Sequence, residues 1–194
     1  MTTGIAANRG AGYVGRLDRA AVFVDAGYVF AEGSKLIAGQ VLPRSQLLLD
    51  YDVLLQLLHG LTASLTGLPL LRVYWYDGAS AGPSAAHVAL SYRPNLKLRL
   101  GGVDASGQQG VDQLLARDLV KLSRSRALAD ALLLSGDDDL RPAAEIAQGH
   151  GVRLHLLAIP PARDNQAAAL AQAADTRHEL SDVEVRTFLR KRSS

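Results

Sequence analysis

The 194-residue chain contains no cysteine, which excludes disulfide bonds, thiolate metal sites and cysteine nucleophiles. Any metal ion it binds is therefore held by oxygen or histidine ligands. Aromatic residues make up only 5% and the formal net charge is only +2, so a role with nucleic acid depends on local basic patches. No apolar run approaches the roughly 20 residues that cross a bilayer, and no secretory signal is recognisable, so we expect a cytoplasmic protein with no membrane partner.

Short apolar runs alternate with amphipathic patterns along the chain, which predicts an α/β, Rossmann-like sandwich with a central parallel sheet of about five strands flanked by helices. Strands are expected at residues 20–25, 69–78, 96–100, 131–135 and 152–159. Helices are expected at 47–65, 84–92, 111–126, 140–149 and 182–191. The last of these begins with a capping box formed by Ser181 and Glu184.

The remaining segments complete the predicted organisation. Residues 28–42 are interrupted by glycine and are expected to form a lid-like loop with at most a short helix. The main domain is predicted at residues 20–160. A flexible leader at 1–19 precedes it, because glycine and alanine without periodicity bury too little surface to offset ordering entropy. A C-terminal helical extension at 161–194 is expected to pack on or near this domain.

Acidic residues follow two of the predicted strands. Asp25 ends the run at 20–25, and Asp137 and Asp139 come directly after the run at 131–135. The carboxyl ends of parallel strands meet at one edge of a sheet, so we expect these acids to lie close together. Two unit charges about 4 Å apart repel by roughly 4 kcal/mol at an effective dielectric near 20, which a divalent cation relieves. The alternative is that each acid caps the helix that follows it.

The predicted helix at 111–126 carries two more acids. Asp112 lies in its first turn, where the helix dipole favours a negative charge with or without a function. Asp118 lies on the apolar face that contains Leu115 and Leu119, where an ionised acid needs a partner. A cation, a backbone donor or a proton satisfies this need, so Asp118 is a candidate both for an acidic pocket and for a structural contact.

The basic and aromatic residues give a weaker pattern. Arg117 and Lys121 follow one stripe of the same predicted helix, and Arg141 follows the Asp137 motif, so all three are candidates for phosphate contacts. Tyr28 is a candidate for stacking on a base. A solvated surface for the cations and a core position for the tyrosine are the alternatives. The five histidines show no metal-ligand spacing and are expected to be structural or exposed to solvent.

Three ordered motifs together resemble the NYN domain family of PIN-like nucleases. They are Val22-Phe23-Val24-Asp25-Ala26-Gly27-Tyr28, Gly110-Val111-Asp112 with Asp118 on the same helix, and Ser135-Gly136-Asp137-Asp138-Asp139-Leu140. The Asp-Ala-Gly-Tyr run is similar to that of a bacterial subgroup of this family. The resemblance covers about residues 20–160 and implies a PIN-like fold with an acidic pocket that binds Mg²⁺ or Mn²⁺.

The resemblance also implies a function, namely metal-dependent hydrolysis of RNA phosphodiester bonds. Asp25, Asp112, Asp137 and Asp139 would be the catalytic acids and metal ligands, and Asp118 an additional pocket acid. A metal-bound water would attack the phosphate and leave a 5′-phosphate and a 3′-hydroxyl. Tyr28, Arg117, Lys121 and Arg141 would contact the RNA. An exposed apolar edge would suit a homo-oligomer, although no residue requires one.

Two other functions are considered. A phosphatase of the haloacid dehalogenase type also places an aspartate after its first strand, but it requires a second aspartate two residues later, where this chain has Gly27. A catalytically weak RNA-binding or assembly module of the NYN fold is favoured by Tyr28, where the family often has asparagine. Gln109, where the family often has lysine, favours the same module.

Overall fold

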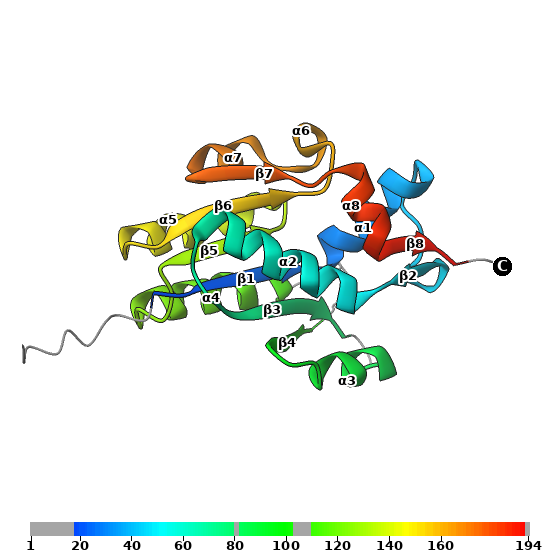
Figure 1. Ribbon diagram of the computed structural model, residues 1–194, viewed down its shortest axis with the longest axis horizontal. Coiled ribbons are helices and arrows are strands. Elements are labelled where there is room, and N and C mark those ends of the chain that lie inside the picture. The colour runs from blue at the N-terminus through cyan, green and yellow to red at the C-terminus, as the bar shows by residue number, and fades with distance from the viewer. Residues whose placement is uncertain (1–17, 80–81, 103–109, 193–194) are drawn as a thin grey trace, which may run out of the picture.

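The central sheet has six parallel strands in the order β4-β3-β1-β5-β6-β7 (Figure 1). The computed structural model describes residues 18–79, 82–102 and 110–192, and all six strands lie within these ranges. The strands of the sheet are β1 (Ala20–Asp25), β3 (Leu70–Gly78), β4 (Leu96–Gly101), β5 (Asp130–Leu134), β6 (Arg153–Ala158) and β7 (Thr176–Glu179). The predicted α/β fold with a central parallel sheet is confirmed, with six strands instead of five in the described part of the chain.

Helices cover both faces of this sheet, as the opposite positions of α2 and α4 in Figure 1 illustrate. One face is packed by α1 (Ala26–Ala38), α2 (Tyr51–Thr66) and α8 (Asp182–Phe188). The other face is packed by α4 (Val111–Arg124), α5 (Arg141–Gly149) and α7 (Ala168–Ala173). Val22 and Val24 of β1 enter the first core and Ala21 and Phe23 the second, which explains the continuous apolar run of this strand.

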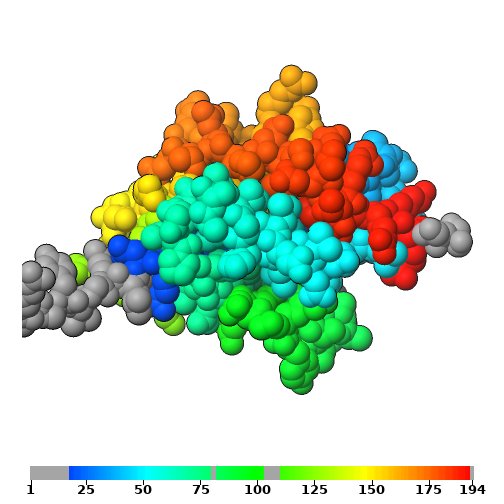
Figure 2. All heavy atoms as spheres, viewed as in Figure 1, coloured from blue at the N-terminus to red at the C-terminus, as the bar shows by residue number. Residues whose placement is uncertain are grey.

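The shorter elements lie at the margins of the sheet. They are η1 (Arg44–Gln46), α3 (Ala85–Ser91), η2 (Asp138–Leu140) and α6 (Ala162–Asn165). Figure 2 shows the face on which α2 lies, with the C-terminal segment that contains α8 beside it. Among the described residues, no helix has both the length and the apolar composition needed to cross a membrane.

The strand order reverses between β1 and β5. From β1 the chain builds outward through β3 and β4, and it then crosses to β5 and continues outward through β6 and β7 on the other side. Ligands of open α/β sheets bind at the carboxyl edge at this point of reversal, because the connections there leave in opposite directions. Asp25 ends β1 and Asp137 follows β5. The topology therefore brings two acids that are far apart in sequence to one edge.

The segment at 28–42 is not the predicted loop, because α1 occupies Ala26–Ala38. Asp25 caps this helix by accepting a hydrogen bond from the Tyr28 N–H, and Gly39, at a φ of +73°, ends it. Gly33 does not interrupt the helix. A Cβ at this position would overlap the Leu189 side chain, so this glycine allows a C-terminal strand to pack closely on α1.

A second sheet corrects two predicted helix boundaries. Leu47–Leu49 forms β2, which pairs antiparallel with β8 (Leu189–Lys191), and the helix α2 begins only at Tyr51, after the Asp50 cap. The predicted helix at 182–191 likewise ends at Phe188. Its capping box of Ser181 and Glu184 is confirmed. The leucine spacing of 47–49 fits a helix equally well, and the pairing with β8 depends on residues about 140 positions away, so the local pattern was misleading.

The residues after 160 are more than a helical extension. They include β7, which pairs with β6 and adds the sixth strand to the central sheet, and β8 of the second sheet. The sequence Thr176-Arg177-His178-Glu179 has no apolar alternation because it forms a largely exposed edge strand. The C-terminal segment is therefore integrated into the same fold. The predicted leader falls almost entirely outside the described residues.

Candidate active site at the carboxyl edge of the sheet

Asp25 is the most enclosed of the predicted site acids at the strand ends, with 7% of its surface exposed. Its Oδ1 accepts a hydrogen bond from the Tyr28 N–H (3.2 Å), and its Oδ2 accepts one from the Ser135 hydroxyl (3.1 Å). Burial raises the pKa of Asp25 above its usual value, the two donors oppose this, and the negative charge of Asp137 adds to it. Ser135 thereby links the end of β1 to the end of β5.

Asp137 and Asp139 lie on the short turn between β5 and α5. The Asp137 Oδ1 accepts the Asp139 N–H (3.0 Å) and caps η2, so Asp137 fills the capping role that was the alternative interpretation of these acids. Asp138 is exposed and lies 3.6 Å from the Arg141 guanidinium. The turn therefore places the charge of Asp137 near Asp25 and leaves Asp138 in a surface ion pair.

Asp112, in the first turn of α4, is affected by the charges of the other predicted site acids. Its pKa is raised from 3.8 to about 6, first by burial and then by the negative charges of Asp25, Asp137 and Asp139. These three acids come from β1 and from the turn after β5, whereas Asp112 comes from a helix that precedes β5. The structure thus brings the other three predicted carboxylates within electrostatic reach of Asp112.

The chemistry of these side chains fits a hard divalent cation, because carboxylate oxygens are the ligands that such cations prefer. Their present orientation is less complete. Among the described residues, no three Asp, Glu or His side chains are already arranged to hold a metal ion. The oxygens of Asp25 and Asp137 point to hydrogen-bond donors, yet each ionised oxygen keeps a further lone pair. Binding of a cation by three of these carboxylates therefore requires them to rearrange.

Replacing Asp112 with Asn should stabilise the metal-free protein above pH 6. A carboxyl whose pKa is raised in the folded state binds more protons there than in the unfolded chain, so it destabilises the fold progressively as pH rises from about 4 to about 6. Thermal denaturation in EDTA should show a higher Tm for Asp112→Asn at pH 7.5 and equal Tm values near pH 4. A higher Tm for the wild type at pH 7.5 would contradict the raised pKa of Asp112.

Asp118 lies elsewhere on α4 and has its own partners. Its side chain is buried, and its Oδ2 accepts hydrogen bonds from the Arg99 Nε of β4 (2.8 Å) and the Tyr76 hydroxyl of β3 (3.3 Å). A buried aspartate needs a partner for its charge, and for Asp118 this partner is Arg99. These contacts explain Asp118 as a link between α4 and the sheet.

Tyr28 is packed in the protein interior, with 8% of its surface exposed. Its hydroxyl donates to the Asn165 Oδ1 (2.7 Å) and accepts the Ile159 N–H (3.2 Å). This burial leaves little of the ring for stacking on a base, in contrast to the prediction. Tyr28 instead ties α1 to the segment after β6.

Two residues of that segment were missed by sequence reasoning. Asn165 donates to the Ile159 carbonyl (2.8 Å), and Gln166 donates to the carbonyls of Ser135 (3.0 Å) and Leu157 (2.9 Å). Gln166 thereby supports the backbone just before Asp137, and Asn165 supports the backbone just after β6. No motif in the sequence marks either residue.

The predicted basic residues divide into two groups. Arg117 and Lys121 are exposed on α4 and line a groove between α4 and α5 that Asp139 also lines. Arg141 lies at the start of α5 and contacts Glu145 (3.1 Å) as well as Asp138. Arg117 and Lys121 therefore line the same groove as Asp139 and form no ion pair with another described residue, whereas Arg141 is already paired. Gln109 lies outside the described residues.

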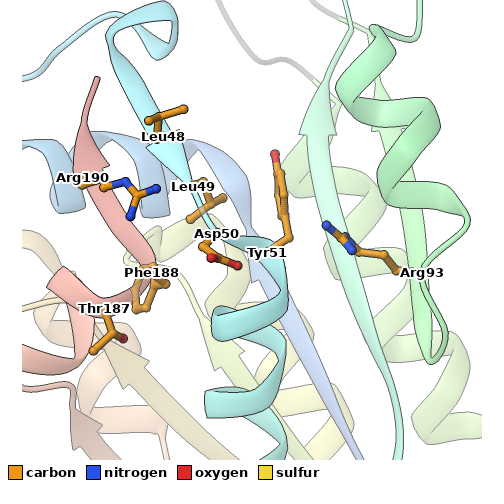
Figure 3. Close-up of a pocket in the computed structure, with 8 residues that line it drawn as sticks. All are labelled: Leu48, Leu49, Asp50, Tyr51, Arg93, Thr187, Phe188 and Arg190. Atoms are coloured by element: carbon orange, nitrogen blue, oxygen red, sulfur yellow. The ribbon is translucent and has the colours of Figure 1, made fainter. Parts of the chain in front are cut away.

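Other polar groups near the strand ends are engaged in structural contacts. Asp77, at the end of β3, binds the Arg44 Nη1 (2.6 Å) and the His87 Nε2 (3.1 Å). A separate cavity of about 220 Å³ lies beside β2 and β8. Figure 3 shows its lining residues, with Arg93 near Tyr51. Its acid, Asp50, caps α2. Neither cluster has the collected carboxylates of the candidate site.

A parallel sheet in this order, with carboxylates at its point of reversal, defines a PIN-like α/β domain. The sequence model of the NYN domain matches residues 19–181, and the chain therefore belongs to the NYN domain family. Membership of this family indicates a PIN-like, RNA-related function, and the nucleases of the family generally use divalent metals.

One curated relative is an uncharacterised protein, y4oD, from Sinorhizobium fredii (strain NBRC 101917 / NGR234). The two chains are 48% identical over 111 residues, which cover 57% of this chain and 52% of the relative. The chain thus spans about half the length of the curated relative that it matches. No solved structure gives a significant match.

Proposed function

We propose that the protein is a metal-dependent ribonuclease that hydrolyses RNA phosphodiester bonds at Asp25, Asp112, Asp137 and Asp139. The proposal rests mainly on the geometry where the strand order reverses: the Ser135 hydroxyl donates to Asp25 at the end of β1 and accepts the Asp137 N–H after β5. Beside these groups, burial and the repulsion of Asp25, Asp137 and Asp139 raise the pKa of Asp112. Repulsion of this kind is costly unless a cation or a proton relieves it. Membership of the NYN family supports RNA as the substrate class and Mg²⁺ or Mn²⁺ as the cation.

In this mechanism the four acids would hold the cation, and the surrounding residues orient the acids. Ser135 and the Tyr28 N–H fix the Asp25 carboxylate, and the Asp139 N–H fixes that of Asp137. Groups that orient ligands in this way typically change metal affinity or activity by about 10–100-fold. A bound divalent cation would lower the pKa of a water molecule and offset the charge that develops on the scissile phosphate.

The proposed activity depends on added metal. Labelled single-stranded, hairpin and tRNA-like RNAs should be cleaved by the wild type with Mg²⁺ or Mn²⁺ and should stay intact in EDTA. Mn²⁺ should also raise the Tm of the protein, because an ion that binds only the folded state stabilises it. Cleavage that persists unchanged in EDTA, or a Tm that Mn²⁺ does not move, would refute a metal-dependent site.

The second candidate function is an RNA-binding or assembly module with little chemistry. It is favoured by the present orientation of the carboxylates, since in the described part of the chain no three of them are arranged around a common point. The same assay separates the two functions. RNA binding without metal-dependent cleavage would identify the module.

A further inference from the structure

A groove of about 640 Å³ runs between α4 and α5, outside the acidic pocket. The α4 wall carries Arg117, Lys121 and Arg124, and the α5 side carries Pro142, Ala143 and Ile146. Asp139 lines this groove, and its negative charge also acts on Asp112. One of the four acids of the candidate site therefore lines the groove.

The α4 wall is a row of positive charges. Arg117, Lys121 and Arg124 are separated by four and three residues, a spacing that places them on one side of a helix. All three are exposed, and none forms an ion pair with another described residue. Such a row suits a polyanion that passes along the helix.

The length of α4 from Asp112 to Arg124 sets the length of strand that the helix can contact. Asp112 and Arg124 lie on the same stripe of the helix as the groove residues Ala116 and Val120, each four residues from the next. Twelve residues at about 1.5 Å each give roughly 18 Å. At about 3.4 Å per stacked nucleotide this corresponds to about five nucleotides.

The floor of the groove is apolar. Val120, Pro142, Ala143 and Ile146 form it, and Ile146 is 42% exposed. Unpaired bases offer flat apolar faces to such a floor, whereas a duplex keeps these faces stacked inside. A second copy of the chain bound by two-fold symmetry would place the same cations against one another, which like charges oppose. The combination of floor and wall therefore favours a single strand.

We propose that the α4–α5 groove binds a single-stranded RNA segment of about five nucleotides and leads it to the acidic pocket. The proposal rests on RNA being the substrate, and it assigns Arg117, Lys121 and Arg124 to the phosphates and the apolar floor to the bases. RNA strands shorter than about five nucleotides on that side of the cleaved bond should bind progressively more weakly.

The test measures RNA binding, so it does not depend on cleavage. In an Asp137→Asn background, fluorescence anisotropy follows an unstructured labelled RNA between about 50 and 200 mM salt. Combining Arg117→Gln, Lys121→Gln and Arg124→Gln should weaken binding by at least about tenfold at about 100 mM salt. Each phosphate contact with a single strand contributes about 0.7 to the slope of log K against log salt, so the loss of three contacts should reduce this slope by about 2.

A matched control removes the same charge from the opposite face. Lys35→Gln, Arg186→Gln and Lys191→Gln together change residues of α1, α8 and β8, and should leave the slope within about 0.5 of the parent. The proposal fails if the groove triple binds RNA like the parent or loses no more than the control triple. The proposal also fails if the groove is instead a dimer interface. In that case the parent would form a dimer, Ile146→Asp would dissociate it, and RNA would not compete with dimer formation. Groove-dependent binding without cleavage by the wild type would support the groove and reject only the hydrolytic function.

Discussion

Asp137→Asn is expected to reduce metal-dependent RNA cleavage by more than about 100-fold, beyond the 10–100-fold typical of groups that only orient a metal ligand. The substitution removes a negative charge from the group of four acids and preserves the size of the side chain. Its amide oxygen can still accept the Asp139 N–H, and asparagine caps helices as well as aspartate does, so the fold should persist. The measurement is kcat/KM with labelled RNA at saturating Mg²⁺ or Mn²⁺, together with the Tm in EDTA.

Asp138→Asn is the matched control, because it makes the same change one residue away. Asp138 is exposed and paired with Arg141, and exposed ion pairs contribute at most about 1 kcal/mol. Its cleavage rate should stay within about twofold of the wild type. Equal losses in the two variants would point to a general effect of charge and would remove Asp137 from the catalytic machinery.

Gly136→Ala is expected to have the largest effect on stability. A Cβ at this position would overlap the carbonyl oxygen of Asn165 and lie 2.9 Å from the Tyr28 ring. Backbone atoms cannot rotate away as a flexible side chain can, so the overpacking should cost about 1–3 kcal/mol and lower the Tm by about 3–10 °C. The displaced turn carries Asp137, so RNA cleavage should also fall at temperatures where the variant is folded.

Gly60→Ala provides the opposite control. Gly60 lies within α2, and nothing lies within 4 Å of the position that its Cβ would take. Alanine there should stabilise the protein by about 0.5–1 kcal/mol because glycine loses more conformational entropy in a helix. If Gly136→Ala is as stable as the wild type, then the contact between the Asp137 turn and the Asn165 segment is not close.

Local patterns in the sequence were sufficient for the class of fold and for most of its elements. The apolar run before Asp25 and the one before Ser135 predict buried parallel strands, and both are fully buried in the sheet. The Ser181 capping box marks the start of α8 because its hydrogen bonds span only three residues. Features of this kind depend on neighbours in the chain, so the sequence alone reveals them.

Elements that depend on distant partners escaped this reasoning. Gly33 has the local character of a helix breaker, and only the position of Leu189 shows that a side chain would find no space there. The pairing of β2 with β8 and the exposed edge strand β7 have no local signature either. The sequence does not show whether the Tyr28 ring is buried or exposed. Its contact with Asn165, 137 residues away, identifies it as a buried link between two segments.

The sequence by itself determined which acids end the strands and which begin the helix α4, since both follow from apolar runs and helix periodicity. Only the tertiary structure decided which of them come near one another. Reversal of the strand order between β1 and β5 brings Asp25 to Ser135, 110 residues away, and lets the charges of Asp25, Asp137 and Asp139 act on Asp112. The fold turns Asp118 to Arg99 instead, because charges interact through space and not along the chain.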